Sequence, residues 1–152
     1  MKPLFVGAIG VITSTLAEGR ALYVDAIGLP LEKADGTNFL HSEKLGGSRY
    51  FGVWPLSAAA KVCFGSESWP TGHPVPQMFI EFEVASPASV AAAASELESK
   101  GYGLLHGPRT DPWGQTVARL QTKDGLLVGI SYVPWMHRRA TQKGKRSRVP
   151  RR

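Results

Sequence analysis

The sequence predicts an α+β fold built from two copies of one module, each a strand, a helix and three further strands. Two segments combine an apolar strand, a helix cap, an amphipathic helix and a glycine stop, and they lie about half the chain apart. Behind each helix, Asp-Gly pairs divide short apolar runs, which is typical of β-hairpins. Because the chain has 152 residues, this repeat indicates a duplicated module within one domain.

The first module begins with an apolar strand over residues 4–12. Thr15 starts a capping-box pattern, so a helix is expected to begin there and to run to about Ala26, with Gly28 as its C-terminal stop. Leu22 and Tyr23 fall on one apolar face of that helix. Three short strands are expected next, over 29–33, 37–43 and 50–54.

The second module repeats this order from residue 77. After a strand over 77–84, Ser86 is the expected N-cap, Pro87 occupies the first helical position and Gly101 ends the helix. Its last three strands are expected over 102–106, 116–121 and 126–133. The modules therefore span about 4–54 and 77–134, joined by a linker over 55–76 with a short helix at 58–64.

The net charge of +6 comes from the C-terminal end. Residues 138–152 hold eight basic residues and no acidic one, so the rest of the chain is slightly acidic. This composition predicts a domain over 1–137 and a basic, disordered tail over 138–152. The tail allows nonspecific contact with nucleic acid, but it lacks the aromatic residues needed for base stacking.

The remaining composition favours a cytoplasmic protein without a membrane anchor. No apolar run approaches the roughly 20 residues of a membrane-spanning helix. The single cysteine, Cys63, cannot form an internal disulfide, and its apolar neighbours predict a buried small side chain rather than a nucleophile.

Several runs carry a family resemblance. They are the strand over 79–84, the Asp-Pro-Trp-Gly-Gln run at 111–115 and the Asp-Gly-Leu-Leu-Val run at 124–128. With the doubled module, they make residues 4–134 resemble the vicinal-oxygen-chelate superfamily, which includes glyoxalases, bleomycin-resistance proteins and dioxygenases. The resemblance implies an open, barrel-like sheet around a cavity, and a homodimer.

Many members of that superfamily bind a divalent metal through His or Glu at four positions. In this sequence the positions fall on Ala8, Phe79, Gly129 and a residue near Gly52 or Val53. None of these side chains can coordinate a metal, whereas a catalytic site usually needs about three protein ligands. We therefore expect no cofactor, with a shifted divalent metal site on His41 and Glu81 as the alternative.

Strand alternation indicates what faces the cavity instead. Ile80, Phe82 and Val84 share the face that the following helix covers, which leaves Phe79, Glu81 and Glu83 on the other face. A carboxylate in a partly apolar cavity could act as a general base, which makes Glu81 the best catalytic candidate. The alternative is that Glu81 and Glu83 are solvated or paired with Arg119.

Aromatic residues beside turns suggest a ligand pocket. Trp54 and Trp113 each adjoin a proline, and flat aromatic walls suit planar or cationic small molecules. Gln115, Arg119 and His41 are the expected polar partners. The alternative for Trp54 is packing in the core or a dimer interface, which we expect for Trp135.

These observations favour a metal-independent small-molecule binding protein with a cavity lined by aromatic and carboxylate groups. Its candidate ligand-binding residues are Phe79, Glu81, Trp54, Trp113, Gln115, Arg119 and His41. The alternative is a metal-dependent, glyoxalase-like lyase or isomerase, or a dioxygenase, with non-standard ligands.

Overall fold

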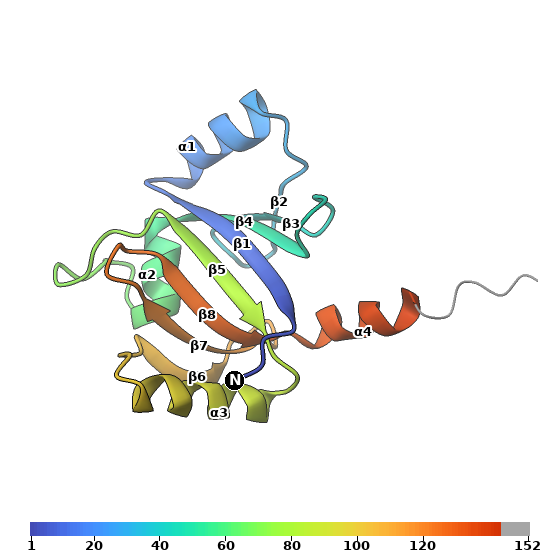
Figure 1. Cartoon of the computed structure of the whole chain (residues 1–152). Coiled ribbons are helices and arrows are strands. Elements are labelled where there is room, and N and C mark those ends of the chain that lie inside the picture. The colour runs from blue at the N-terminus through green and yellow to red at the C-terminus, as the bar shows by residue number, and fades with distance from the viewer. Residues whose placement is uncertain (144–152) are drawn as a thin grey trace, which may run out of the picture.

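The computed structural model describes residues 1–143, with side chains up to residue 138 (Figure 1). In this part of the chain, eight strands form one mixed sheet in the order β2-β3-β4-β1-β5-β8-β7-β6. The strands are β1 (Phe5–Thr13), β2 (Glu32–Lys33), β3 (Leu40–Ser42), β4 (Tyr50–Pro55), β5 (Met78–Glu83), β6 (His106–Thr110), β7 (Thr116–Gln121) and β8 (Leu127–Tyr132). The helices are α1 (Leu16–Gly19), the π-helix η1 (Arg20–Ala26), α2 (Leu56–Phe64), α3 (Pro87–Ser99) and α4 (Pro134–Lys143).

The strand order confirms the duplicated module and the α+β fold class. In each half the first strand pairs in parallel with the last, β1 with β4 and β5 with β8. The halves join where β1 pairs with β5 in antiparallel register, with Ala8 opposite Glu81 and Gly10 opposite Phe79. The result is a curved sheet with free edges at β2 and β6, so it is open rather than a closed barrel.

Helix α3 covers the outer face of the second module tightly. The Ser86 side chain accepts a hydrogen bond from the Ser89 backbone N–H at 3.1 Å, as the predicted N-cap requires. Val90, Ala93 and Ala94 are buried against β7 and β8, because small side chains let the helix lie close to the sheet. None of the helices within residues 1–143 is long and apolar enough to span a bilayer.

The first helix differs from its prediction. The Thr15 side chain accepts from the Glu18 backbone N–H at 3.2 Å, and Gly28 adopts a φ of 82° where the helix ends, as expected. However, after one α-helical turn the chain continues as the π-helix η1. The wider turn rotates the predicted apolar face, so that Tyr23 packs inward while Leu22 is 51% exposed.

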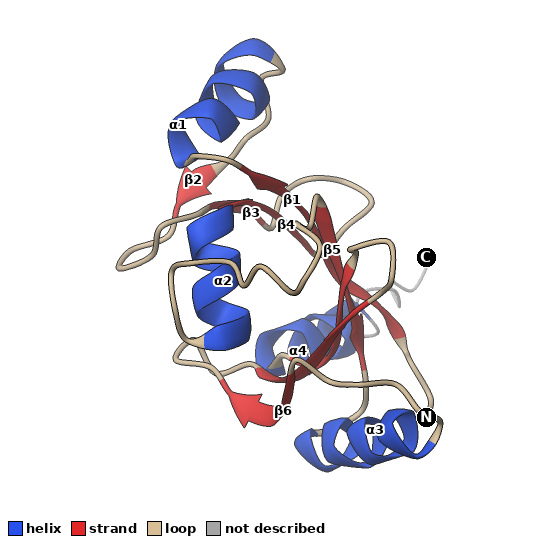
Figure 2. Ribbon diagram, turned by 90° about the vertical axis from the view of Figure 1, so that its left-hand side faces the viewer, coloured by secondary structure: helices blue, strands red, loops and turns tan. Residues whose placement is uncertain are grey.

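The inner face of the sheet is closed at one end by α2, which the linker supplies (Figure 2). Ala59 and Cys63 of α2 pack against Ala8, Trp54 and Phe79. Burial raises the pKa of the Cys63 thiol to about 11, so the thiol is protonated at neutral pH. This confirms Cys63 as a core residue.

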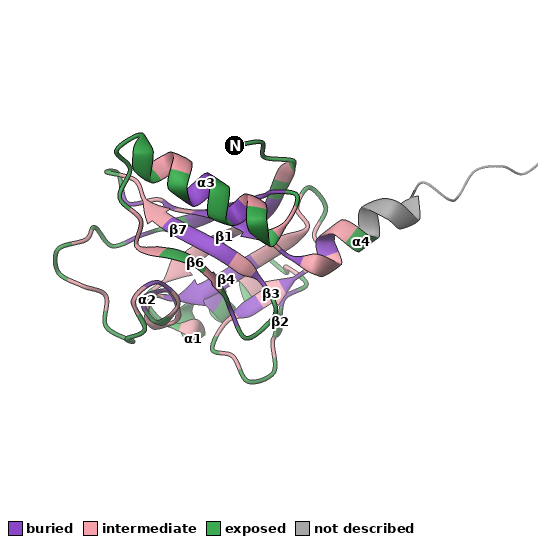
Figure 3. Cartoon of the chain, turned by 90° about the horizontal axis from the view of Figure 1, so that it is seen from below, coloured by how far each residue is buried: buried purple, intermediate pink, exposed green. Residues whose placement is uncertain are grey.

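Helix α4 lies at the other end of the inner face and projects from the body (Figure 3). Its first turn is anchored, because Glu83 Oε2 accepts from the Val133 N–H at 2.8 Å and contacts His137 Nε2 at 3.0 Å. Arg49 adds a hydrogen bond to the Met136 carbonyl oxygen. Helix α4 includes residues 138–143 of the predicted tail, and 144–152 lie outside the described residues.

Candidate functional site

A cavity of about 240 Å³ lies on the inner face of the sheet, where α4 forms part of its wall. Six of its lining residues carry aromatic rings and three carry carboxylates. The rings belong to Phe39, His41, Tyr50, Trp54, Trp113 and Trp135, and the carboxylates to Asp35, Glu43 and Glu81. The residues lining it include no lysine or arginine.

The first module supplies most of the aromatic wall. Tyr50, Gly52 and Trp54 alternate along β4, so their positions share the inner face. The Trp54 and Phe79 ring centroids are 4.3 Å apart, and His41 stacks on Tyr50 at 5.5 Å with an interplanar angle of 18°. Burial raises the pKa of the Tyr50 phenol, so this ring stays neutral.

The second module supplies a buried polar network around Glu81. Glu81 Oε1 accepts from Arg119 Nη2 at 3.2 Å, and Glu81 Oε2 accepts from Gln115 Nε2 at 2.6 Å. Both Glu81 and Arg119 are at least 95% buried. These contacts compensate the desolvation of the Glu81 carboxylate while leaving it part of the cavity wall.

Arg119 extends this network away from the cavity. Its two terminal nitrogens each donate to Asp111 Oδ2 at 3.3 Å, and Nη1 lies 3.2 Å from His106 Nε2. Burial, chiefly, lowers the pKa of His106 to about 4, so its ring is neutral near pH 7. His106 Nδ1 lies 2.8 Å from the Gly107 carbonyl oxygen, which fits a proton on Nδ1 and leaves Nε2 to accept from Arg119.

The loop between β6 and β7 connects this network to the mouth of the cavity. Trp113 Nε1 donates to Gln115 Oε1 at 2.7 Å, which fixes the amide so that its Nε2 faces Glu81 and Ser131. Gly114 has a φ of 88°, a left-handed conformation that favours glycine. The Trp113 side chain is therefore held at the entrance, 45% exposed.

The structure brings most of the predicted site residues together. Trp54, Trp113, Gln115, Glu81 and His41 line the cavity. Phe79 lies against Trp54, and Arg119 pairs with Glu81; neither is among the lining residues.

Other residues of the site depart from the expectations or were missed by them. Glu83 is on the predicted face but anchors α4, and Trp135 lines the cavity where packing was expected. Tyr50 and Phe39 were not predicted. Tyr50 could have been found from its alternation with Trp54, whereas Phe39 comes from a loop that shows no such pattern.

Comparison with known proteins identifies the family. The sequence model described as Glyoxalase/Bleomycin resistance protein/Dioxygenase superfamily matches residues 6–130, which include both modules. The chain belongs to this superfamily. No curated protein matches it.

Solved structures of the glyoxalase/bleomycin-resistance superfamily share the fold. A member from Vibrio splendidus 12B01 has a TM-score of 0.53 at 14% identity, over 84% of this chain and 97% of the other. A variant of Streptomyces coelicolor methylmalonyl-CoA epimerase, in complex with 2-nitronate-propionyl-CoA, has a TM-score of 0.50 at 19% identity, over 86% and 94%. At these identities the likeness shows the fold alone.

The four positions used by metal-binding members of the superfamily meet on the inner face. Gly52 is the fourth position, because it lies opposite Gly10 on that face, whereas Val53 packs on the outer face with Leu40. The other three are Ala8, Phe79 and Gly129.

Side chains from neighbouring positions fill the space beside these glycines. A Cβ atom on Gly52 would lie 2.9 Å from Trp54 Nε1 and 3.1 Å from Phe79 Cζ, and one on Gly129 would lie 2.9 Å from Glu81 Cγ. The residues at the four positions therefore do not fit a metal. Within the described residues, no group of three His, Cys, Asp or Glu side chains is placed to hold one elsewhere.

Proposed function

We propose that this protein binds an organic cation with an aromatic ring, without using a metal. The observation that carries the proposal is the composition of the cavity wall: six aromatic rings, one of them the imidazole of His41, and three carboxylates, with no lysine or arginine among the lining residues. Ring faces attract a cation through their quadrupoles, and a carboxylate adds a direct charge interaction. An anion would face three carboxylates without a lysine or arginine in the lining to offset them.

The cavity separates two tasks between its walls. The Tyr50 and Trp54 side chains offer apolar surface for the ring of a ligand. Glu81 offers a carboxylate that Arg119 and Gln115 hold in one orientation. A wall that is already fixed before binding loses little conformational entropy when the ligand enters.

Binding of a simple probe tests the proposal. We expect calorimetry to show that benzyltrimethylammonium binds and that phenylacetate, with the same ring and the opposite charge, does not. Trp54→Leu should weaken binding roughly tenfold or more, because cation–π contact with a desolvated ring is worth about 2 kcal/mol. Glu43→Gln should weaken it severalfold through the lost charge.

The exposed variant Glu18→Gln, on α1, is the matched control and should bind as the parent chain does. Equal binding of phenylacetate and the ammonium probe would contradict the proposal.

The alternative is an enzyme of the same superfamily that binds a metal through His41 and Glu81. Both residues line the cavity, but within the described residues no third His, Cys, Asp or Glu side chain joins them, and a catalytic site usually needs about three protein ligands. We therefore expect zinc, nickel, manganese and iron(II) to leave the thermal transition unchanged. Stoichiometric retention of any of these metals, lost in His41→Ala, would favour the enzyme.

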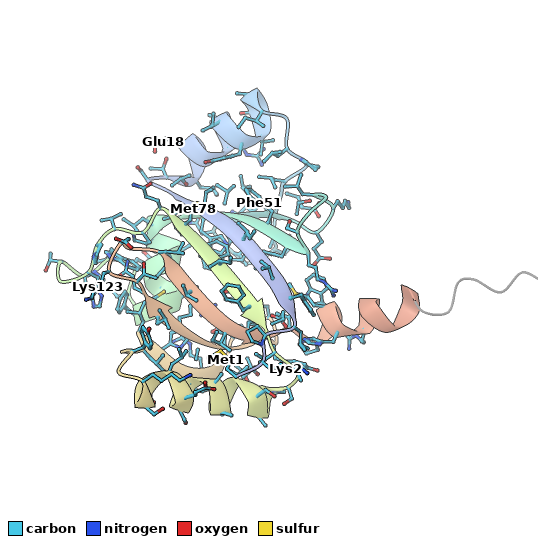
Figure 4. The ribbon with its side chains drawn as sticks, in the orientation of Figure 1. Met1, Lys2, Glu18, Phe51, Met78 and Lys123 are labelled. Carbon is cyan, nitrogen blue, oxygen red and sulfur yellow. The ribbon has the colours of Figure 1, made fainter. Side chains whose placement is uncertain are left out.

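Apolar residues on the outer face of the sheet favour the predicted homodimer. The homodimer and the cytoplasmic location both stay predictions. Ile9, Val11, Phe51 and Met78 alternate onto this face. Figure 4 shows Phe51 and Met78 between α1 and α3, and Met78 is 43% exposed. A second copy would remove such apolar surface from water.

A further inference from the structure

A second hollow adjoins the cavity on the side of α2. It is an open groove of about 870 Å³ that runs along one side of the helix, past Ser57, Ala58 and Lys61. The groove and the cavity share Asp35, Thr37, Phe39 and Trp113 as lining residues. The two hollows are therefore neighbours with a common wall.

Two aromatic rings form that boundary. The Phe39 and Trp113 ring centroids are 6.4 Å apart in an edge-to-face arrangement, one from each module. Each ring belongs to a loop, and Trp113 is 45% exposed. A ligand in contact with both rings would touch the cavity on one side and the groove on the other.

The sizes of the two hollows differ in a way that bears on the ligand. Small-molecule pockets usually measure about 300–1,000 Å³ and bury most of the ligand. At about 240 Å³ the cavity holds a head group only, whereas the groove, at about 870 Å³, has the volume for the rest of a larger molecule.

The charges of the groove also differ from those of the cavity. Lys61 and Arg109 face the groove together with three acidic residues, and Arg109 Nε lies 3.3 Å from Asp111 Oδ1. The acidic residues are Asp35, Glu67 and Asp111. This near balance gives hydrogen-bond donors and acceptors without a strong preference for either charge, which suits a polar, uncharged chain.

We infer that the natural ligand is elongated, with a cationic aromatic head in the cavity and a polar, uncharged tail in the groove beside α2. The inference rests on the proposed function for the head group and adds the place and chemistry of the tail. Ala58 and Lys61 line the tail site, and Phe39 and Trp113 contact the ligand where the two parts meet.

Two probes separate the parts of this inference. The short probe is benzyltrimethylammonium, and the long probe is the same cation with one N-methyl replaced by a tri(ethylene glycol) chain. In calorimetry we expect the parent protein to bind the long probe at least tenfold more tightly than the short one. Ala58→Trp should fill the groove and abolish this gain, while the affinity for the short probe stays unchanged.

Two further variants serve as a second test of the groove and as a control. Lys61→Trp fills the same groove from an exposed position, so it should abolish the gain even if Ala58→Trp disturbs the fold. Ala91→Trp, on the exposed side of α3, is the matched control and should keep the gain.

The outcomes distinguish the two proposals. A gain that survives both groove-filling substitutions, or no gain at all when the short probe binds, would overturn the inference and leave the proposed function standing. Failure of both probes to bind the parent protein would overturn the proposed function.

Discussion

The two modules share a topology but have complementary inner faces. On β1 and β4 of the first module, Ala8 lies opposite Tyr50 and Gly10 opposite Gly52; on β5 and β8 of the second, Phe79 lies opposite Leu127 and Glu81 opposite Gly129. The inward side chains of β1 are therefore small, whereas those of its counterpart β5 are large. A Cβ atom on Gly10 would lie 2.1 Å from Phe79 Cε1, so the small residues leave the space that the large ones fill.

This difference shows how a duplicated fold can make an asymmetric site. The first module became an aromatic wall, and the second became a network of buried charges around Arg119. A cavity between such faces can combine apolar contact with a fixed charge. A symmetric pair of modules would place the same chemistry on both sides.

The largest loss of stability is expected from removing Arg119 from the charge network of the second module. Arg119→Met would leave Glu81 buried without a cation and Asp111 paired only with Arg109, which should lower the free energy of unfolding by about 3–5 kcal/mol. Urea denaturation would measure this loss. Lys100→Met removes an exposed cation that pairs with Glu96 on α3 and should cost under about 1 kcal/mol. Equal losses in the two variants would contradict a stabilising role for the buried network.

A smaller loss of stability is expected from disturbing the packing of Gly10 in the first module against Phe79 in the second. Gly10→Ala should lower the free energy of unfolding by about 1–3 kcal/mol or more, because its new methyl group meets the Phe79 ring and, at 2.6 Å, the Gly52 carbonyl oxygen. Adding Phe79→Leu should cost less than the two single changes together, by at least about 0.5 kcal/mol in a double-mutant cycle.

Gly46→Ala provides the control for this cycle, since nothing lies within 4 Å of a Cβ atom there. It should change stability little. Strict additivity of Gly10→Ala and Phe79→Leu would show that the two sites do not interact.

The smallest expected change in stability depends on pH and concerns His106, at the end of the Arg119 network that lies away from the cavity. The pKa of His106 is about 6.5 in the unfolded chain and is lowered to about 4 in the folded chain. Between these two pH values the unfolded chain therefore binds a proton at His106 that the folded chain does not bind. Stability should therefore fall through this window as the pH is lowered, and be unaffected by His106 above it.

The variant His106→Gln isolates this contribution. Its stability profile should be flatter than that of the parent chain between pH 6.5 and 4, as measured by urea denaturation at several pH values. Parallel profiles would mean that His106 titrates alike in the folded and unfolded states.

Sequence patterns predicted the repeated order of elements, because each boundary depends on local chemistry. The Ser86 and Thr15 caps and the glycine stops act within one or two turns of a helix. The π-helix η1 was not predicted, since the same residues fit an α-helical period. Its effect appears at Leu22, which is exposed rather than packed.

The candidate site was predictable where it depends on strand alternation and not where it depends on distant contacts. The side of the sheet to which Glu81 belongs followed from the period of β5. The C-terminal wall was missed, because α4 is basic in sequence and is positioned by Glu83, about 50 residues earlier. The pairing of Arg119 with Asp111 likewise depends on a loop whose conformation no periodicity reveals.

The close packing around Gly52 and Gly129 on the inner face also limits which substitutions the protein can accept during evolution. A ligating side chain at Gly52 or Gly129 would collide with Trp54 or Glu81 before it could reach a metal. Phe79 would have to shrink first, and a smaller side chain there would leave a void against Trp54. Each step toward a metal site lowers stability before any ligand set is complete. Packing beside these glycines thus opposes the introduction of metal ligands at the four positions.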